Sequence, residues 1–315
     1  MTLHALRARD VLEIAFVNNM PDQALAATRA QFERLVRAGA EGREIRWRCY
    51  TLPGLERSET ARRYLARDHE GIEALYRRGA DALIVSGSEP RAARLDHEPY
   101  WPQLQTLADW ARTHTFSTLW SCLAAHAATL HLAGIERRRM PKKISGVYTF
   151  RRLGEDWTGE RAGSSILTPH SRYNALDAEA LARRCFKIGA WSPDVGVDMF
   201  WREEPSLFVF LQGHPEYEAE TLLKEYRRDV LRYLSGERVD YPDQPENYFS
   251  AEMSQRLSQL GSRVLEKTER HAEQALAETL SPEKCARPWA DDAARLYRAW
   301  IRNVSDRIDA LRHSA

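Results

Sequence analysis

Short apolar runs alternate with amphipathic stretches along the first half of the chain. Residues 11–17 (VLEIAFV) and 82–85 (ALIV) are typical of buried strands, because each run is short, apolar and followed by turn-forming residues. Residues 45–49 alternate apolar side chains with arginine, which predicts a strand with one solvent-exposed face near a sheet edge. The stretch between the first two strands predicts a helix with one buried face, formed by Leu25, Thr28, Phe32 and Leu35.

The same alternation continues further along the chain. We expect a helix over 100–112, a strand over 115–120 and an alanine-rich helix over 124–132. A buried strand at 207–211 precedes a helix at about 219–234, whereas residues 133–205 give no regular pattern. Strands that alternate with helices predict an α/β fold with a doubly wound, mostly parallel sheet, whose sites lie at the carboxyl ends of the strands.

A boundary is expected near residues 241–249, where two prolines interrupt the helical pattern. We therefore divide the chain into a main domain, residues 1–249, and a C-terminal helical extension, residues 250–315. The extension shows the pattern of two charged amphipathic helices, separated by prolines at 282 and 288. We expect these helices to pack on the main domain or on a second subunit.

Composition excludes several classes of protein. The 315 residues include 46 Lys and Arg and 45 Asp and Glu, so a net charge of +1 gives no global field for nucleic acid or an anionic membrane. No run approaches the roughly 18 apolar residues of a membrane-spanning helix, and the N-terminus lacks a secretory signal. We expect a cytoplasmic protein. Four cysteines without a CxxC pair predict neither a metal site nor a disulfide framework.

Cys122 lies where a predicted buried strand meets a predicted helix. The unpaired N–H groups and the positive dipole end of that helix favour a thiolate, which is the reactive form of cysteine. Cys122 is therefore placed as a nucleophile. The alternative is a small buried apolar side chain, the more common fate of a single cysteine.

His214 and Glu216 follow a second predicted buried strand. Residues i and i+2 of an extended segment project to the same side, so Glu216 is positioned to orient the His214 imidazole. Together with Cys122, they have the composition of a nucleophile, base and carboxylate as found in acyl-transfer enzymes. The sequence predicts that the three side chains meet at one edge of the sheet.

Four segments give the chain a specific family resemblance. The motifs WSCLAAHAA, KKISGVY, PHSRY and GHPEYEAETLLKEYRRDV resemble the homoserine O-succinyltransferase family, over about residues 11–249. The resemblance implies a class I glutamine-amidotransferase-like, flavodoxin-like fold and a ping-pong acyl transfer early in methionine biosynthesis. Cys122 matches the position that forms the acyl-thioester, His214 the proton acceptor and Glu216 its partner. The implied substrates are succinyl-CoA and L-homoserine, with acyl-CoA as a co-substrate and no resident cofactor; we expect a homodimer.

The resemblance also assigns substrate-binding positions to Lys143, Ser171 and Arg228. A guanidinium can hold the carboxylate of an amino acid through two hydrogen bonds, which suits Arg228. Each residue also has an alternative role. Arg228 could be a solvated arginine on a helix, and Ser171 could cap a loop. Lys143 belongs to the basic segment 137–143, which could be a solvated face or hold the phosphates of CoA.

Arg91 matches the family position that influences which acyl-CoA is accepted. An arginine there favours succinyl over acetyl, because only succinyl carries a terminal carboxylate. Alternatives are a solvent-facing Arg91, a contact with a CoA phosphate, or pairing with Glu89. One departure concerns Asp22 and Gln23, which stand where the family commonly has a lysine pair.

Other activities remain open at this point. A homoserine O-acetyltransferase or a serine O-acyltransferase would use the same mechanism. An amidotransferase-like hydrolase shares the fold and the Cys-His-Glu set, but such enzymes usually have a glycine-rich turn around the cysteine, which this chain lacks. A non-enzymatic interaction protein that uses the C-terminal helices is the third class.

Overall fold

A computed structural model of the chain describes residues 11–154, 156–266, 271–280 and 285–314. The strands of its larger sheet are β1 (Val11–Val17), β2 (Glu44–Thr51), β3 (Glu70–Gly71), β4 (Ala82–Val85), β5 (Ser117–Ser121), β8 (Lys187–Ile188), β11 (Met199–Glu203) and β12 (Leu207–Leu211). Their order is β3-β2-β1-β4-β5-β12-β11-β8, and all neighbours from β3 to β12 run parallel. β11 and β8 are added antiparallel. The predicted doubly wound, mostly parallel sheet is confirmed.

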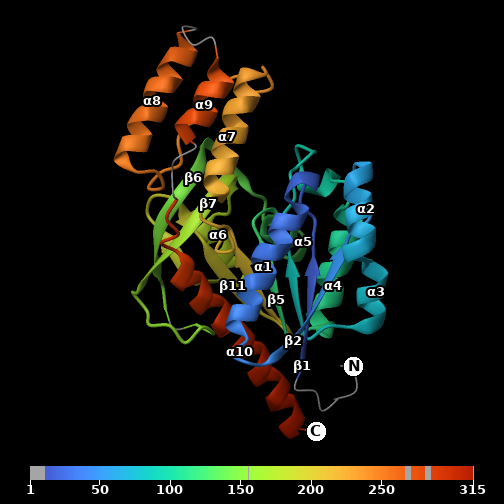
Figure 1. Cartoon of the computed structure of the whole chain (residues 1–315). Coiled ribbons are helices and arrows are strands. Elements are labelled where there is room, and N and C mark those ends of the chain that lie inside the picture. The colour runs from blue at the N-terminus through green and yellow to red at the C-terminus, as the bar shows by residue number, and fades with distance from the viewer. Residues whose placement is uncertain (1–10, 155, 267–270, 281–284, 315) are drawn as a thin grey trace.

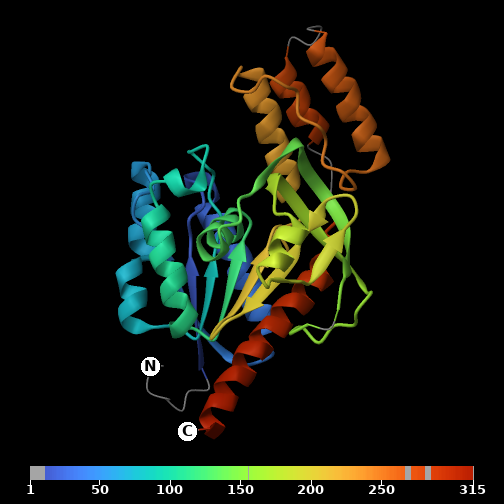
Figure 2. The same cartoon turned by 180° about the vertical axis from the view of Figure 1, so that it is seen from behind.

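Helices cover both faces of this sheet (Figures 1 and 2). One face packs against α1 (Leu25–Gly39) and α10 (Ala290–Ser314) and the other against α3 (Ile72–Arg78), α4 (Trp101–His114) and α5 (Leu123–Ala133). Successive residues of β4 take part in opposite cores: Ile84 contacts the α1 side, and Leu83 and Val85 contact the α4 side. This explains why β4 is apolar at every position, as expected for a strand covered on both faces. The remaining helix of this half, α2 (Glu59–Asp68), packs Leu65 near the start of α1.

Residues 138–197, whose strands the sequence left unassigned, form most of a second, smaller sheet. Its order is β10-β9-β6-β7, with a long antiparallel hairpin of β6 (Arg138–Arg152) and β7 (Ser165–Ala175). β9 (Ala190–Ser192) and β10 (Gly196–Val197) complete it, and α6 (Ala178–Arg183) connects β7 to the larger sheet. The hairpin places Pro169 beside the segment that follows β12, where the Pro169 carbonyl accepts a hydrogen bond from the His214 N–H.

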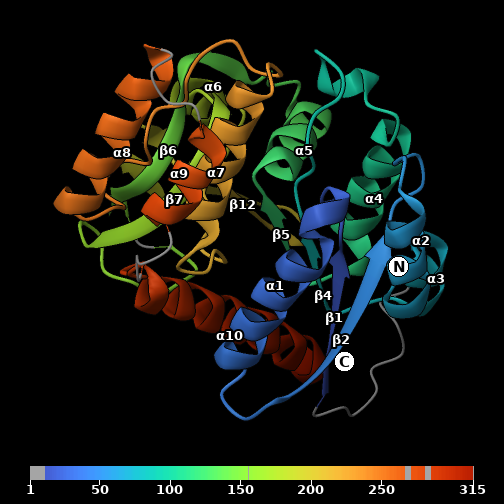
Figure 3. The same ribbon diagram turned by 45° about the horizontal axis from the view of Figure 1, so that its top comes forward.

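Within the described ranges, three helices follow residue 250, where the sequence predicted two. α8 (Ala251–Leu265) and α9 (Ala272–Leu280) pack against α7 (Thr221–Leu234) and form a separate apolar cluster at one side of the molecule (Figure 3). α10 returns to the main core, where the Trp300 indole N–H donates to Ser117 Oγ over 2.9 Å. Pro282, one of the two prolines predicted to separate the helices, lies outside the described residues. The division of the chain after residue 249 stays a prediction. The apolar residues of α10 belong to the core between α1 and the larger sheet.

Candidate active site

Cys122 occupies the sharp turn between β5 and α5. Its backbone has φ +51° and ψ −112°, in the positive-φ region that side-chain-bearing residues rarely adopt. Such strain persists only where the surrounding structure enforces it, and here the Cys122 N–H donates to Leu211 O of β12 over 2.7 Å. The turn holds the half-buried thiol at the start of α5, as in the nucleophile turn of other α/β enzymes.

His214 and Glu216 reach the same sheet edge from β12. β12 pairs with β5 in parallel, with Leu211 opposite Ser121, so the segments that follow the two strands leave the sheet side by side. The His214 Nδ1 atom lies 2.8 Å from Glu216 Oε1, and the Cys122 side chain lies close enough to the imidazole to raise its pKa. The predicted convergence of these three side chains is therefore present in the structure.

The electrostatics of His214 favour its protonated form. Burial opposes a charge on the imidazole, but the negative charges of Cys122 and Glu216 and the hydrogen bonds to both outweigh it and raise the pKa of His214 well above its ordinary value. Tyr217 stacks on the imidazole with ring centroids 4.3 Å apart. The arrangement is suited to a thiolate next to an imidazolium, which is the reactive state of a cysteine nucleophile.

A buried polar network behind His214 was missed by sequence reasoning. Asp198 Oδ1 accepts a hydrogen bond from the Gly213 N–H (3.0 Å) and lies 3.2 Å from His170 Nε2. Burial lowers the pKa of His170 to about 4, so this imidazole stays neutral. Arg172 Nε donates to His170 Nδ1 over 3.1 Å. No sequence spacing links these residues, because they come from β7, the segment before β11 and the end of β12.

Two segments with backbone N–H groups are candidates for donors beside Cys122: the start of α5 at Leu123 and the turn at residues 18–20. The N–H groups of this turn donate to Tyr50 O, Ser86 Oγ and Asn18 Oδ1, so the turn does not supply a donor. Instead Gly87 lies against α5, where a Cβ at this residue would be 3.2 Å from the Leu123 nitrogen. The loop after β4 therefore faces the first N–H of the helix.

Lys143 and Arg228 meet at one carboxylate. Lys143 Nζ donates to Asp229 Oδ2 over 2.7 Å, and Arg228 Nη2 lies 3.1 Å from Asp229 Oδ1. Asp229 is buried, which would raise the pKa of its carboxyl, but the charges of Lys143 and Arg228 lower it overall. Arg228 keeps 44% of its side chain exposed, so its guanidinium is accessible to a ligand.

Ser171 lies on β7, opposite Ser145 of β6, and is half-buried. It is two residues after Pro169, whose carbonyl accepts the His214 N–H over 2.8 Å. Ser171 therefore lies on the same strand, β7, whose Pro169 carbonyl braces His214. Within the described residues, Ser171 forms no hydrogen bond with Lys143 or Arg228.

Arg91 lies in the loop after β4 and pairs with Glu56, with Nη1 2.8 Å from Oε2. Glu89, the partner that the sequence offered, pairs with Arg232 of α7 instead. Arg91 also lines a cavity of about 450 Å³ between its own loop, α5 and the chain that leads into β6.

Asp22, which stands in place of a family lysine, accepts hydrogen bonds from the Ser58 N–H and from Arg57.

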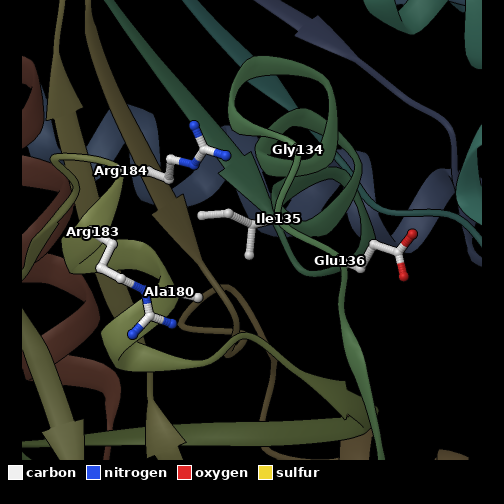
Figure 4. A pocket seen from close by; sticks show the side chains of 6 residues that line it. All are labelled: Gly134, Ile135, Glu136, Ala180, Arg183 and Arg184. Atoms are coloured by element: carbon white, nitrogen blue, oxygen red, sulfur yellow. The ribbon is translucent and has the colours of Figure 1, made fainter.

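A second cavity of about 500 Å³ adjoins the first and shares Glu136 with it. Figure 4 shows Arg183 and Arg184 on one side of it and the segment Gly134–Glu136 on the other.

His126, on α5, is buried and places Nε2 2.9 Å from Gln212 Oε1. The described ranges contain no helix long and apolar enough to cross a membrane and no cluster of three metal-ligating side chains.

Comparisons with known proteins agree on one family. Residues 4–309 match the family described as homoserine O-succinyltransferase. The chain is 45% identical over 304 residues to the homoserine O-succinyltransferase of Bradyrhizobium japonicum, covering 95% of this chain and 93% of that protein. It is 48% identical over 250 residues to the Rhodopseudomonas palustris protein of the same name, covering 79% and 75%.

Among solved structures, a glutamine amidotransferase from Thermotoga maritima aligns with a TM-score of 0.50 and 13% identity, covering 93% of this chain and 98% of that one. At this identity the likeness concerns the fold alone. It agrees with the class I glutamine-amidotransferase-like fold that the sequence resemblance implied.

Proposed function

Because this chain belongs to the homoserine O-succinyltransferase family, we propose that it transfers the succinyl group of succinyl-CoA to the hydroxyl of L-homoserine. The single observation that supports this most is the meeting of Cys122, His214 and Glu216 at the ends of two adjacent strands. Such a reaction would stand early in methionine biosynthesis, in the cytoplasm, and we propose a homodimer as the working form.

The first half of the reaction forms an acyl-thioester on Cys122. The Cys122 thiolate attacks the thioester carbonyl of succinyl-CoA, the carbonyl electrons move to oxygen, and the CoA sulfur leaves with a proton from the His214 imidazolium. The N–H of Leu123 and the Gly87 segment are the proposed donors to the oxyanion. Exchange of one thioester for another changes little in bond energy, so the enzyme supplies placement and charge stabilisation.

The second half transfers the acyl group to oxygen. His214, now neutral, accepts the proton of the homoserine hydroxyl while its oxygen attacks the Cys122 thioester, and the Cys122 sulfur leaves as a thiolate. Glu216 orients the imidazole and stabilises the imidazolium that forms. Arg228, Lys143 and Ser171 are proposed to hold homoserine, with the exposed Arg228 guanidinium on its carboxylate.

Arg91 is proposed to favour succinyl over acetyl as the donor group. Its present partner Glu56 has 90% of its side chain exposed, and exposed ion pairs contribute little. A succinyl carboxylate can therefore replace Glu56 at small cost. An acetyl donor or a serine acceptor would use the same chemistry, so a panel of donors and acceptors belongs in the test.

Intact-mass spectrometry tests the mechanism directly. Incubation with succinyl-CoA and no acceptor should add one succinyl group to the protein, and addition of homoserine should remove it as O-succinylhomoserine. The Cys122→Ala variant should show no adduct, while Cys185→Ala, at an exposed cysteine, should behave as the parent. Full transfer by Cys122→Ala would refute the mechanism, and glutamate release from glutamine would favour an amidotransferase-like hydrolase.

A further inference from the structure

The cavity that Arg91 lines carries more positive charge than its carboxylates neutralise. Of its four arginines, Arg91 and Arg94 form ion pairs with Glu56 and Asp96. Arg137 and Arg139 form no ion pair within the part of the chain that the structure describes. Two neighbouring guanidinium groups that form no ion pair are suited to an anion.

Arg137 has a buried hydrogen-bond donor that faces no acceptor among the described residues. Its Nη1 atom is buried and has no hydrogen-bond partner among the described residues. Burial and the charge of Arg139 lower the pKa of Arg137, although the charge of Glu98 acts in the opposite direction. A buried donor without a partner is costly, so an anionic ligand would satisfy a group that the protein leaves open.

Arg139 is held at the rim of the same cavity by an aromatic side chain. Its guanidinium lies over the Tyr173 ring, 5.2 Å from the centroid, and Tyr173 also lines the cavity. The Tyr173 hydroxyl accepts a hydrogen bond from Arg238 over 2.8 Å, which fixes the ring. The Arg139 N–H groups form no hydrogen bond among the described residues, so they can donate to a ligand.

Two segments of the chain link the residues that line the cavity to Cys122. The loop that begins at Gly87, against Leu123, continues as residues 90–96, which line the cavity. Leu130 also lines it and follows Cys122 by eight residues, about 12 Å along the α5 axis at 1.5 Å per residue. These two segments place the cavity beside the loop and the helix that flank Cys122.

We propose that Arg137 and Arg139 bind the phosphate groups of the acyl-CoA donor in this cavity. The proposal rests on the proposed function, since it names where the co-substrate of that reaction is held. CoA carries its phosphates at the far end of an uncharged pantetheine arm, so its charges must lie at a distance from the thioester. A volume of about 450 Å³ is more than one carboxylate needs. Guanidinium groups suit phosphate because they offer paired donors.

Direct binding of CoA by calorimetry is the first test. Each of Arg137→Gln and Arg139→Gln should weaken CoA binding by about tenfold, and the double variant by about 100-fold. Binding to the parent protein should weaken as salt is added. Arg138→Gln is the matched control, because Arg138 is exposed and does not line the cavity. Equal CoA affinity in the parent and the double variant would overturn the proposal.

A donor without phosphates separates the phosphates from the succinyl carboxylate. With the succinyl thioester of N-acetylcysteamine, kcat/KM of the double variant should stay within about twofold of the parent, whereas with succinyl-CoA it should fall by about 100-fold. An equal loss with both donors would place the succinyl carboxylate at these arginines and refute the proposal.

The two proposals fail in different ways. Loss of CoA binding in the double variant supports the phosphate site even if Cys122 is never acylated, which would count against the proposed reaction alone. Normal acylation of Cys122 together with unchanged CoA binding in the double variant would refute the phosphate site alone.

Discussion

Asp198 Oδ1 accepts a hydrogen bond from the Gly213 N–H over 3.0 Å, directly before His214. The Asp198 backbone carbonyl also accepts the Gln212 N–H over 2.8 Å, so one residue fixes two consecutive peptides at the end of β12. Asp198 is buried, which by itself raises the pKa of its carboxyl, but contacts with His170, Thr168 and the Gly213 N–H lower it overall. The carboxylate therefore stays charged and holds the segment that carries His214.

We expect Gly213→Ala to lower both activity and stability. An alanine Cβ at this position would lie 2.5 Å from Thr168 Cγ2, 2.6 Å from His170 Nε2 and 2.7 Å from Asp198 Oδ1. The resulting shift should cost about 1–3 kcal/mol of the free energy of unfolding and displace His214. Chemical denaturation and kcat measure the two effects. Gly154→Ala, where nothing lies within 4 Å of an added Cβ, serves as control; a fully active and stable Gly213→Ala would contradict this account.

His214→Ala should reduce turnover far more than Glu216→Gln. The imidazole moves the proton in both halves of the proposed reaction, whereas Glu216 orients it from 2.8 Å away. Loss of a general base lowers rates by about 10²–10⁴-fold. Steady-state kcat for the two variants gives the comparison, and near-normal rates in both would rule out the assigned roles.

Arg228→Gln should impair the second half-reaction and spare the first. If Arg228 holds the homoserine carboxylate, its loss should raise KM for homoserine by about 10- to 100-fold, because a charge-assisted contact is worth roughly 1.5–3 kcal/mol. The rate of Cys122 succinylation without acceptor should not change. Arg227→Gln changes an exposed neighbour on the same helix and is the control. A variant with unchanged KM would remove Arg228 from the acceptor site.

Arg91→Glu should shift the donor preference toward acetyl-CoA. The substitution replaces an attraction for the succinyl carboxylate with a repulsion, so we expect the ratio of kcat/KM for succinyl-CoA to that for acetyl-CoA to fall by about 10- to 100-fold. Comparing both donors in the same variant cancels any general loss of activity. The assignment fails if the ratio does not change or if the parent protein prefers acetyl-CoA.

His126 should make the protein less stable in acid. Burial lowers the pKa of His126 to about 3 even though its hydrogen bond with Gln212 opposes this, whereas in the unfolded chain it is about 6.5. Above pH 6.5 the side chain is neutral in both states and has no effect. Between pH values of about 3 and 6.5, only the unfolded state takes up the proton. The free energy of unfolding therefore falls as pH decreases, by about 1.4 kcal/mol per pH unit.

Denaturant unfolding between pH 6 and pH 4 checks this expectation. The slope of the unfolding free energy against pH should be smaller in His126→Gln than in the parent by about 1.4 kcal/mol per pH unit. His114→Gln, at an exposed histidine, should leave the slope unchanged. Identical slopes in the parent and His126→Gln would show that His126 is protonated in the folded protein.

The sequence by itself determined the alternation of strands and helices and the places where β5 and β12 end. These features depend on local patterns: four- to seven-residue apolar runs, a helical period and turn-forming residues. Because parallel strands end at one sheet edge, the meeting of Cys122 with His214 and Glu216 followed from the same reasoning. Lys143 and Arg228 came only from the family motifs.

Only the tertiary structure decided which side chains pair across the sheet edge. Three features depend on how the β6–β7 hairpin and the loop after β4 pack: the Asp198 contact with the Gly213 N–H, the Glu56–Arg91 ion pair, and the Arg137 Nη1 atom without a hydrogen-bond partner among the described residues. The strands of residues 133–205 were not assigned from sequence because several of them are only two or three residues long, as β9 shows. Hydrogen bonds and ion pairs between distant segments leave no periodic trace in the chain, since their geometry is fixed by packing.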